Sequence, residues 1–284
     1  NIDPDKIEEK ITPKTKAIIT VDLAGQPCDY DKIKKIAIKH NLKIIEDAAH
    51  SVGAKYWEDM VGNICDITCF SFYPTKNMTA AEGGMILTND PEIYETVKIY
   101  SLHGMSKDAW RRYSKEGSPH WDTLVPGYKY NMTDIQSAIG IHQLKRLESA
   151  IARREEIAKT YDEAFKDLPG ITLPKKIKNI KHAHHLYIII VDTEKLKISR
   201  DEFIDYLREE NVGSGIHFIS LHKHTYYKNR FKIEDKDLPN ASYISDRIIS
   251  LPFYPTMTQK DVQDVIKAVK KTVNHTKKTS FWKI

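Results

Sequence analysis

Cysteine is scarce in this sequence of 284 residues, and long apolar runs are missing from it. The three cysteines, Cys28, Cys65 and Cys69, are an odd and sparse set, which argues against a disulfide framework and for a reducing compartment. Cys65 and Cys69 also lack the Cys-x-x-Cys spacing of zinc and redox sites, so we interpret them as apolar packing. No apolar run approaches the ~20 residues of a membrane span, so we expect no transmembrane helix.

The first residues, Asn1-Ile-Asp-Pro-Asp, have neither the basic nor the apolar region of a signal peptide, which predicts a cytoplasmic protein. The net charge is +5, and much of the positive excess lies in the pairs Lys270-Lys271 and Lys277-Lys278. Because no nucleic-acid-binding motif or interleaved aromatic stripe accompanies these lysines, we interpret them as a solvated tail and expect no nucleic-acid partner. A modest positive charge also suits a small substrate that carries phosphate.

The first half of the chain alternates between strand-like and helix-like patterns. An apolar run, a helical stripe and a second apolar run follow one another, as in a βαβ unit with parallel strands and a right-handed crossover. Two more strands and a helix that opens with proline come next. The predicted elements are strands at Lys16–Asp22, Leu42–His50, Ile67–Phe72 and Gly84–Thr88, and helices at Asp29–Asn41 and Pro91–Gly104.

A long polar and aromatic stretch, Ser106–Pro126, predicts a loop, and loops of this length are often functional. Thr133 to Gln136 then has the form of a capping box that begins a long helix ending near Leu168, where Pro169-Gly170 stops it. We place the boundary between two α/β domains inside this helix, as residues 1–144 and 145–284. The apolar stripe predicted to face the core consists of Ile135, Ile139, Leu147, Ile151, Ala158, Tyr161 and Phe165.

The second half restarts the same alternation on a smaller scale. Capping patterns at Ser199 and Thr258 begin two of its helices. The predicted strands are His185–Asp192 and Val212–Phe218, and the predicted helices are Ser199–Asn211 and Thr258–Val273.

Three polar residues stand at or just after the ends of predicted strands: Asp47, Ser71 and Lys76. In open parallel sheets, ligands bind outside the carboxyl ends of the strands, so these residues are candidates for one site. An equal alternative is that Glu46-Asp47 simply caps the turn that follows. A lysine amine, a carboxylate and a small hydroxyl together are the groups that pyridoxal 5′-phosphate (PLP) requires for its aldehyde, its pyridine nitrogen and its phosphate.

Several linked motifs extend this pattern to a family resemblance over about Ile2 to Asn274. The chain resembles the DegT/DnrJ/EryC1/StrS family of PLP-dependent sugar aminotransferases, and two motif variants look closest to transaminases of UDP-linked 4-keto sugars, including the 4-amino-4-deoxy-arabinose type. The motifs, in chain order, are EDAAHSVGA, CFSFYPTKN, AEGGMILTND, SLHGMSKDAW, GYKYNMTDIQSAIG, HHLYIIIV and SLPFYPTMT.

The resemblance implies a fold and a reaction. The fold is the fold type I α/β architecture of aspartate aminotransferase, with a mostly parallel large-domain sheet, helices on both of its faces, and a smaller C-terminal α/β domain. The reaction moves an amino group from an amino acid, glutamate in the family, to a nucleotide-linked keto sugar. Family members begin with a further Gly/Thr-rich segment that contacts the cofactor, so we expect the N-terminal part of the large domain to be absent from this sequence.

The resemblance also implies individual roles. Lys76 would form the Schiff base with PLP and then carry the proton. Asp47 would pair with the pyridine nitrogen, His50 would lie near the ring or its 3-hydroxyl, and Ser71 would bind the phosphate. A further phosphate contact comes from the partner subunit in this family, from Lys129 or Asn131, which predicts a homodimer with shared active sites.

Five histidines need separate interpretation. His182, His184 and His185 cluster in the sequence, but no carboxylate pattern accompanies them, and we expect no metal site. His185, His217 and His222 are candidates for substrate contacts, with a purely structural role an equal alternative for His217 and His222.

Two other functions remain open. A PLP-dependent sugar dehydratase shares the family scaffold, but family dehydratases replace the Schiff-base lysine with histidine, so Lys76 argues against it. A non-catalytic or incomplete family member, regulatory or a fragment, would keep the fold without the reaction.

Overall fold

The computed structural model describes residues 1–106 and 122–279, and most of the predicted loop Ser106–Pro126 lies outside the described residues. The described chain forms two compact units. The first holds Asn1–Ser149 and Ile177–His185, and the second holds Ala150–Lys176 and Leu186–Ile284.

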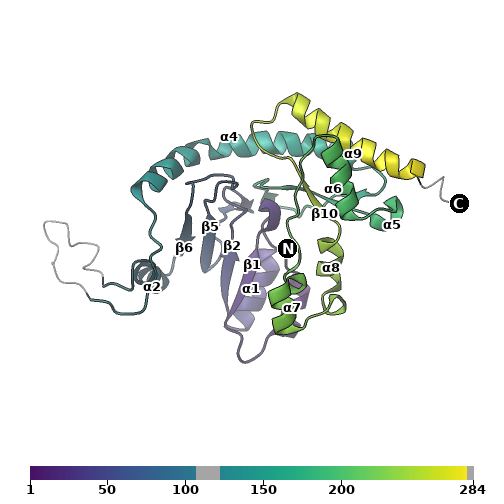
Figure 1. Ribbon diagram of the computed structural model, residues 1–284. Helices are drawn as coiled ribbons and strands as arrows, with labels where there is room; N and C mark the ends of the chain where they lie inside the picture. The colour runs from purple at the N-terminus through teal and green to yellow at the C-terminus, as the bar shows by residue number, and fades with distance from the viewer. Residues whose placement is uncertain (107–121, 280–284) are drawn as a thin grey trace. The chain divides into compact units, whose positions relative to one another are not determined.

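The first unit is built on a four-stranded sheet of order β1-β2-β5-β6 (Figure 1). β1, β2 and β5 are parallel, and β6 runs antiparallel to β5, so the prediction of a mostly parallel sheet is confirmed. The helices α1 and α2 begin at Asp29 and Asp90, whose carboxylates accept hydrogen bonds from first-turn N–H groups. The bounds are β1 (Ala17–Val21), α1 (Tyr30–Lys39), β2 (Lys43–Asp47), β5 (Ile67–Ser71), β6 (Gly84–Leu87) and α2 (Pro91–Ser101).

A second, small sheet in this unit was not predicted from the sequence. Its order is β4-β3-β8, and β8 comes from far along the chain. The segment Ile177–His185 therefore returns to the first unit, where Ala183 is fully buried in the core with Tyr30 and Ile33. This corrects the continuous division at residues 144 and 145, because strand pairing with β3 (Lys55–Tyr56) holds the segment. The other bounds are β4 (Asp59–Met60) and β8 (Ile180–Lys181).

The long helix α4 (Asp134–Phe165) begins at the predicted capping box: Gln136 N donates to Thr133 Oγ1, and Thr133 N donates to Gln136 Oε1. Its apolar stripe is buried from Leu147 onward but not before. Ile135 is 77% exposed and Ile139 is 38% exposed, so their predicted place in the core is wrong. Helical spacing puts these side chains on the same stripe, but no described side chain covers that part of it.

The second unit packs helices on an antiparallel sheet of order β10-β9-β7. Its core joins the last part of α4 to β9, β10, α6 and α9, and includes the fully buried Tyr161, Phe165, Ile189 and Phe203. The bounds are β7 (Ile171–Thr172), β9 (Tyr187–Val191), α5 (Thr193–Leu196), α6 (Arg200–Glu209), α7 (Thr225–Phe231), α8 (Pro239–Ser245), β10 (Ile248–Leu251) and α9 (Gln259–Thr279).

The predicted strand Val212–Phe218 is wrong. Only Gly215 pairs with the sheet, through a single bridge to Ser250. Gly213 and Gly215 weaken strand formation because glycine loses more backbone entropy on folding and offers no side chain to pack. Five 3₁₀ turns complete the described elements: Pro4–Lys6, Glu8–Lys10, Leu23–Gly25, Leu221–Lys223 and Asp235–Asp237. Within the described ranges, no helix has both the length and the apolar composition that a membrane crossing requires.

Candidate active site

Asp47, Ser71 and Lys76 come to the same edge of the first unit's sheet. Asp47 is the last residue of β2 and Ser71 the last residue of β5, and these strands pair in parallel with Asp47 opposite Cys69. Lys76 follows in the connection to β6. Burial lowers the pKa of the Lys76 amine, and the negative charge of Asp47 acts in the opposite direction. The amine and the carboxylate are therefore close enough to interact.

The connection that carries Lys76 is held at its base by Phe72. Phe72 O accepts hydrogen bonds from Ala80 N at 2.9 Å and from Thr79 Oγ1 at 3.1 Å, and Phe72 N donates to Gly83 O at 2.8 Å. Gly84, the first residue of β6, is required for a steric reason. A Cβ on Gly84 would lie 2.8 Å from Phe70 O, so only glycine fits opposite β5 at this point.

The Asp47 carboxylate does cap the turn after β2, since its Oδ1 accepts a hydrogen bond from Ala49 N at 3.0 Å. This is the alternative that the sequence left open. A carboxylate has two oxygens and about four acceptor positions, so one capping bond is compatible with a further partner. The cap fixes the direction of the carboxylate at the sheet edge.

His50 is 8% exposed and lies in the same turn. Ala24 N donates to His50 Nδ1 at 3.2 Å, so Nδ1 is an acceptor and the ring proton belongs on Nε2. The ring of His50 stacks at a tilt on the ring of His185, with 4.3 Å between the centroids. This arrangement supports a neutral His50 in a fixed orientation.

Asn77, next to Lys76, connects the lysine loop to these rings. Its Nδ2 donates to Ala183 O at 2.6 Å, which leaves its Oδ1 as the acceptor for His185 Nδ1 at 3.1 Å. Asn77 was not predicted from the sequence as a site residue. His185 is 6% exposed, so its contacts favour orientation of the His50 ring over the substrate contact that we expected.

A close backbone approach brings the His185 segment to this place. Ala183 N donates to Gly25 O and His185 N donates to Ala24 O, both at 2.9 Å. Gly25 has φ +99°, and a Cβ on it would lie 2.9 Å from His184 N. The glycine is therefore required both for its backbone conformation and for the contact.

Lys129 and Asn131 are exposed residues just before α4. Their side chains are hydrogen-bonded, with Lys129 Nζ donating to Asn131 Oδ1. The backbone of Lys129 forms an isolated antiparallel β-bridge with Leu102. Tyr128 and Tyr130 beside them stack with 4.8 Å between centroids. A cation and an amide are thus paired on an exposed segment, which is suitable for an incoming phosphate.

His217 and His222 belong to the second unit. His217 Nδ1 lies 2.9 Å from Ser250 Oγ. His222 is 6% exposed, and its Nε2 lies 3.0 Å from both Asp235 Oδ1 and Ser242 Oγ. These contacts favour the structural alternative for His222. Among the described residues, no group of three or more His, Cys, Asp or Glu side chains is arranged to hold a metal ion.

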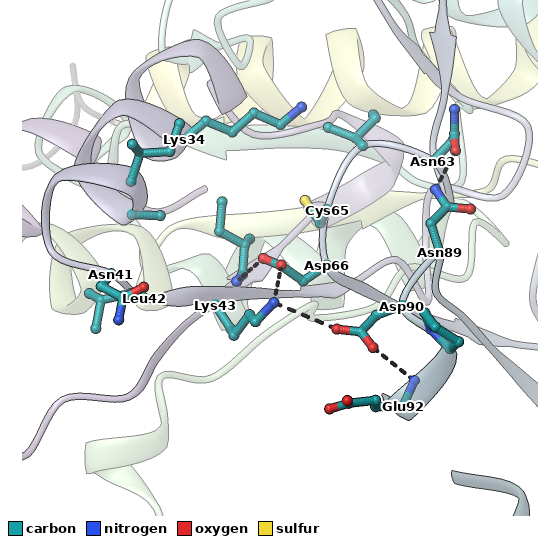
Figure 2. Close-up of a pocket in the computed structure, with 15 residues that line it drawn as sticks. Lys34, Asn41, Leu42, Lys43, Asn63, Cys65, Asp66, Asn89, Asp90 and Glu92 are labelled. Atoms are coloured by element: carbon teal, nitrogen blue, oxygen red, sulfur yellow. Dashed lines mark hydrogen bonds and ion pairs between the residues drawn. The ribbon is translucent and has the colours of Figure 1, made fainter. Parts of the chain in front are cut away.

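A cavity of about 1040 Å³ lies at the other edge of the sheet (Figure 2). It is lined by the start of β2, the end of α1 and the residues before β5 and after β6. Two charged side chains of its lining are paired with each other: Lys43 Nζ donates to Asp66 Oδ1 at 3.0 Å, and Asp66 Oδ2 accepts from Ile44 N. Because the carboxyl ends of the parallel strands lie at the opposite edge, this cavity is not part of the candidate active site.

The residues at the carboxyl edge fit PLP by their chemistry. A half-buried lysine amine, a carboxylate directed by a cap, a hydroxyl and a fixed imidazole are the groups that bind its aldehyde, its ring and its phosphate. A mostly parallel α/β sheet with these groups at its carboxyl edge has the layout of a PLP-dependent transferase.

Comparison with known proteins identifies the family. The model of the DegT/DnrJ/EryC1/StrS aminotransferase family matches residues 1–270, and the chain belongs to this family of PLP-dependent sugar aminotransferases. The resemblance found in the sequence, the aminotransferase fold and the PLP cofactor are therefore confirmed. Membership in this family also supports the prediction of an enzyme over the alternative of a non-catalytic family member.

Two relatives match nearly the whole chain. An uncharacterized protein of Methanocaldococcus jannaschii, MJ1066, is 52% identical over 274 residues, which are 96% of this chain and 71% of the relative. The spore coat polysaccharide biosynthesis protein SpsC of Bacillus subtilis is 48% identical over 96% of this chain and 70% of its own length.

Among solved structures, the putative sugar aminotransferase Spr1654 of Streptococcus pneumoniae in its PMP form is 33% identical, with a TM-score of 0.88. The match covers 97% of this chain and 73% of that chain. The same protein in its PLP form is 31% identical, with a TM-score of 0.86 over 97% of this chain and 72% of that chain.

Proposed function

We propose that this protein transfers an amino group from an amino acid, glutamate, to the ketone of a nucleotide-linked keto sugar. The family and its cofactor support a sugar substrate and an amino donor. The SpsC relative, a polysaccharide biosynthesis protein, supports a product that enters a polysaccharide. A UDP-linked 4-keto sugar is the substrate we favour, on the EDAAH and GYKYN motif variants.

Lys76 is the residue on which the proposal depends. PLP supplies an aldehyde that accepts an amine and a ring that withdraws electrons. In this chain, burial lowers the pKa of Lys76 and so increases the fraction of neutral amine, the form that can attack an aldehyde. When it is not bonded to the aldehyde, the same amine would remain at this sheet edge, where it could accept a proton and return it.

The neighbouring groups hold the ring and the phosphate. Asp47 would accept a hydrogen bond from the protonated pyridine nitrogen, with the carboxylate that the bond from Ala49 N orients. His50 presents a neutral ring, and Ser71 presents a hydroxyl at the end of β5.

We also propose a homodimer in which Lys129 or Asn131 of one subunit contacts the phosphate at the site of the other. The pair is exposed and lies directly before the rigid start of α4, so it can reach across a two-fold interface. His217 stays a candidate for a substrate contact.

The observation that carries the proposal is the half-buried lysine beside Asp47 at the carboxyl edge of a parallel sheet. The test is borohydride reduction of the protein after incubation with PLP, followed by peptide mass mapping. We expect the pyridoxyl adduct on Lys76 and none in Lys76→Ala. An adduct on another lysine of the wild type, with Lys76 unmodified, would contradict the assignment.

A further inference from the structure

A fully buried aspartate, Asp22, lies immediately after β1 and behind the turn that carries Asp47 and His50. β1 pairs with β2 so that Val21 stands opposite Asp47. Asp22 N continues this pairing by donating to Asp47 O at 3.1 Å. The main chain of Asp22 thus holds the first residue of the turn.

The Asp22 side chain holds the other end of the same turn. Its Oδ2 accepts a hydrogen bond from Ser51 Oγ at 2.8 Å, and Ser51 follows His50 directly. Between these two ends, Ala24, two residues after Asp22, donates its N–H to His50 Nδ1. The short loop after β1 therefore contacts the turn at its start, at its end and at its imidazole.

The other oxygen of Asp22 accepts hydrogen bonds from groups that do not belong to the turn. Oδ1 accepts from Tyr30 Oη at 2.8 Å and from Cys28 N at 3.0 Å. Burial raises the pKa of Asp22, while the hydrogen bonds from Tyr30, Ser51 and Cys28 lower it. Three donors are directed at its two oxygens, and this arrangement suits the carboxylate form.

A buried carboxylate is costly, and an apolar residue would avoid that cost. Replacement by an apolar side chain would instead leave the Ser51 hydroxyl and the Cys28 N–H buried without this acceptor. We propose that Asp22 is a positioning residue, which fixes the turn from Asp47 to Ser51 and so sets the directions of the Asp47 carboxylate and the His50 ring. This inference rests on the proposed function for its catalytic consequence, but not for the turn geometry itself.

We call the two hydrogen bonds from Asp22 to the ends of the turn, Asp22 N to Asp47 O and Ser51 Oγ to Asp22 Oδ2, the clamp. Asp22→Asn and Ser51→Ala test the clamp, and Tyr30→Phe is the matched control. Asp22→Asn keeps the shape and an Oδ1 acceptor but replaces the Oδ2 acceptor with a donor. Ser51→Ala removes only the hydrogen bond from Ser51 Oγ to Asp22 Oδ2. If Asp22→Asn does not fold, Ser51→Ala alone tests the clamp. Tyr30→Phe removes a bond of the same 2.8 Å length from the same carboxylate, but one that does not involve the turn.

Two readouts apply to all three variants. The first is the imidazole ¹⁵N spectrum of His50 in the cofactor-free protein, identified by its loss in His50→Gln. The second is the kcat and KM of amino transfer from L-glutamate in the PLP-loaded protein, followed by cofactor absorbance. We expect Asp22→Asn and Ser51→Ala to change the His50 tautomer signals and to lower kcat by about tenfold or more with little change in KM. Tyr30→Phe should leave both readouts near wild type.

Wild-type His50 signals and wild-type kcat in both clamp variants would overturn the inference. An equal loss in Tyr30→Phe would overturn it as well, because the effect would then be general destabilisation. If the wild type transfers no amino group, the proposed function is wrong. The His50 spectrum alone then decides whether the clamp exists. In that case, changed signals in the clamp variants but not in Tyr30→Phe support the clamp, and unchanged signals refute it.

Discussion

The buried Glu46, directly before Asp47, makes the folding stability depend on pH. Glu46 is 0% exposed, and burial together with the negative charge of Asp22 raises its pKa to about 7 from an ordinary 4.5. Thr68 Oγ1 donates to Glu46 Oε2 at 2.6 Å, whereas Oε1 is buried with no hydrogen-bond partner in the described part of the chain. The folded protein therefore favours the protonated form of this side chain.

The sign and the size of the effect follow from this pKa. Because the folded-state pKa exceeds the unfolded one, Glu46 contributes stability below about pH 4.5 and loses it as the pH rises through about 7. The difference corresponds to about 3 kcal/mol of unfolding free energy. Tyr30, Cys65 and Cys69 also face Glu46 or its charge, but burial raises the pKa of each, so they stay neutral in this range.

Glu46→Gln tests this reasoning by removing the ionisation while keeping the shape and the acceptor for Thr68. Urea unfolding of the variant and the wild type at several pH values between 4.5 and 8 gives the difference in unfolding free energy. We expect this difference to shift by about 3 kcal/mol in favour of the variant across that range. Glu58→Gln, at an exposed glutamate, is the control and should show no such shift. A flat difference for Glu46→Gln would refute the assignment of the proton to Glu46.

Two further predictions concern the proposed reaction. Asp47→Asn should keep the fold, measured by its unfolding midpoint, but lower kcat by more than about 100-fold, because a neutral amide cannot stabilise a protonated pyridine nitrogen; near-wild-type turnover would leave Asp47 as a cap only. Mixing Lys76→Ala subunits with Lys129→Ala/Asn131→Ala subunits should restore activity that neither parent has, since each heterodimer would hold one intact site, and no recovery despite proven subunit exchange would contradict a shared site.

The strand ends that carry the site could be predicted from the sequence. Apolar runs bounded by turn residues give β2 and β5, and parallel strands end at a common edge, so Asp47 and Ser71 had to lie near each other. The capping patterns at Thr133, Ser199 and Thr258 also hold in the structure. These features depend on local chemistry, which a single sequence displays.

The contacts that orient the site could not be predicted in this way. Asn77 and Ala183 are 106 residues apart, and nothing near either residue in the sequence indicates that they meet. The return of Ile177–His185 to the first unit depends on a two-residue strand, which is too short for a hydrophobic period. Burial of a helical stripe likewise depends on what covers it, as the exposed Ile135 and Ile139 show.

Two opposing influences set the pKa of the Lys76 amine. Burial favours the neutral amine, and the charge of Asp47 favours the protonated one. A cation placed against Asp47 would compensate that charge and leave burial as the stronger influence, so the amine would lose its proton more easily. To lose its proton in this way, Lys76 needs a neighbouring carboxylate that has a fixed direction and can still bind a cation. The cap from Ala49 to Asp47 Oδ1 and the clamp from Asp22 provide that fixed direction from within the fold.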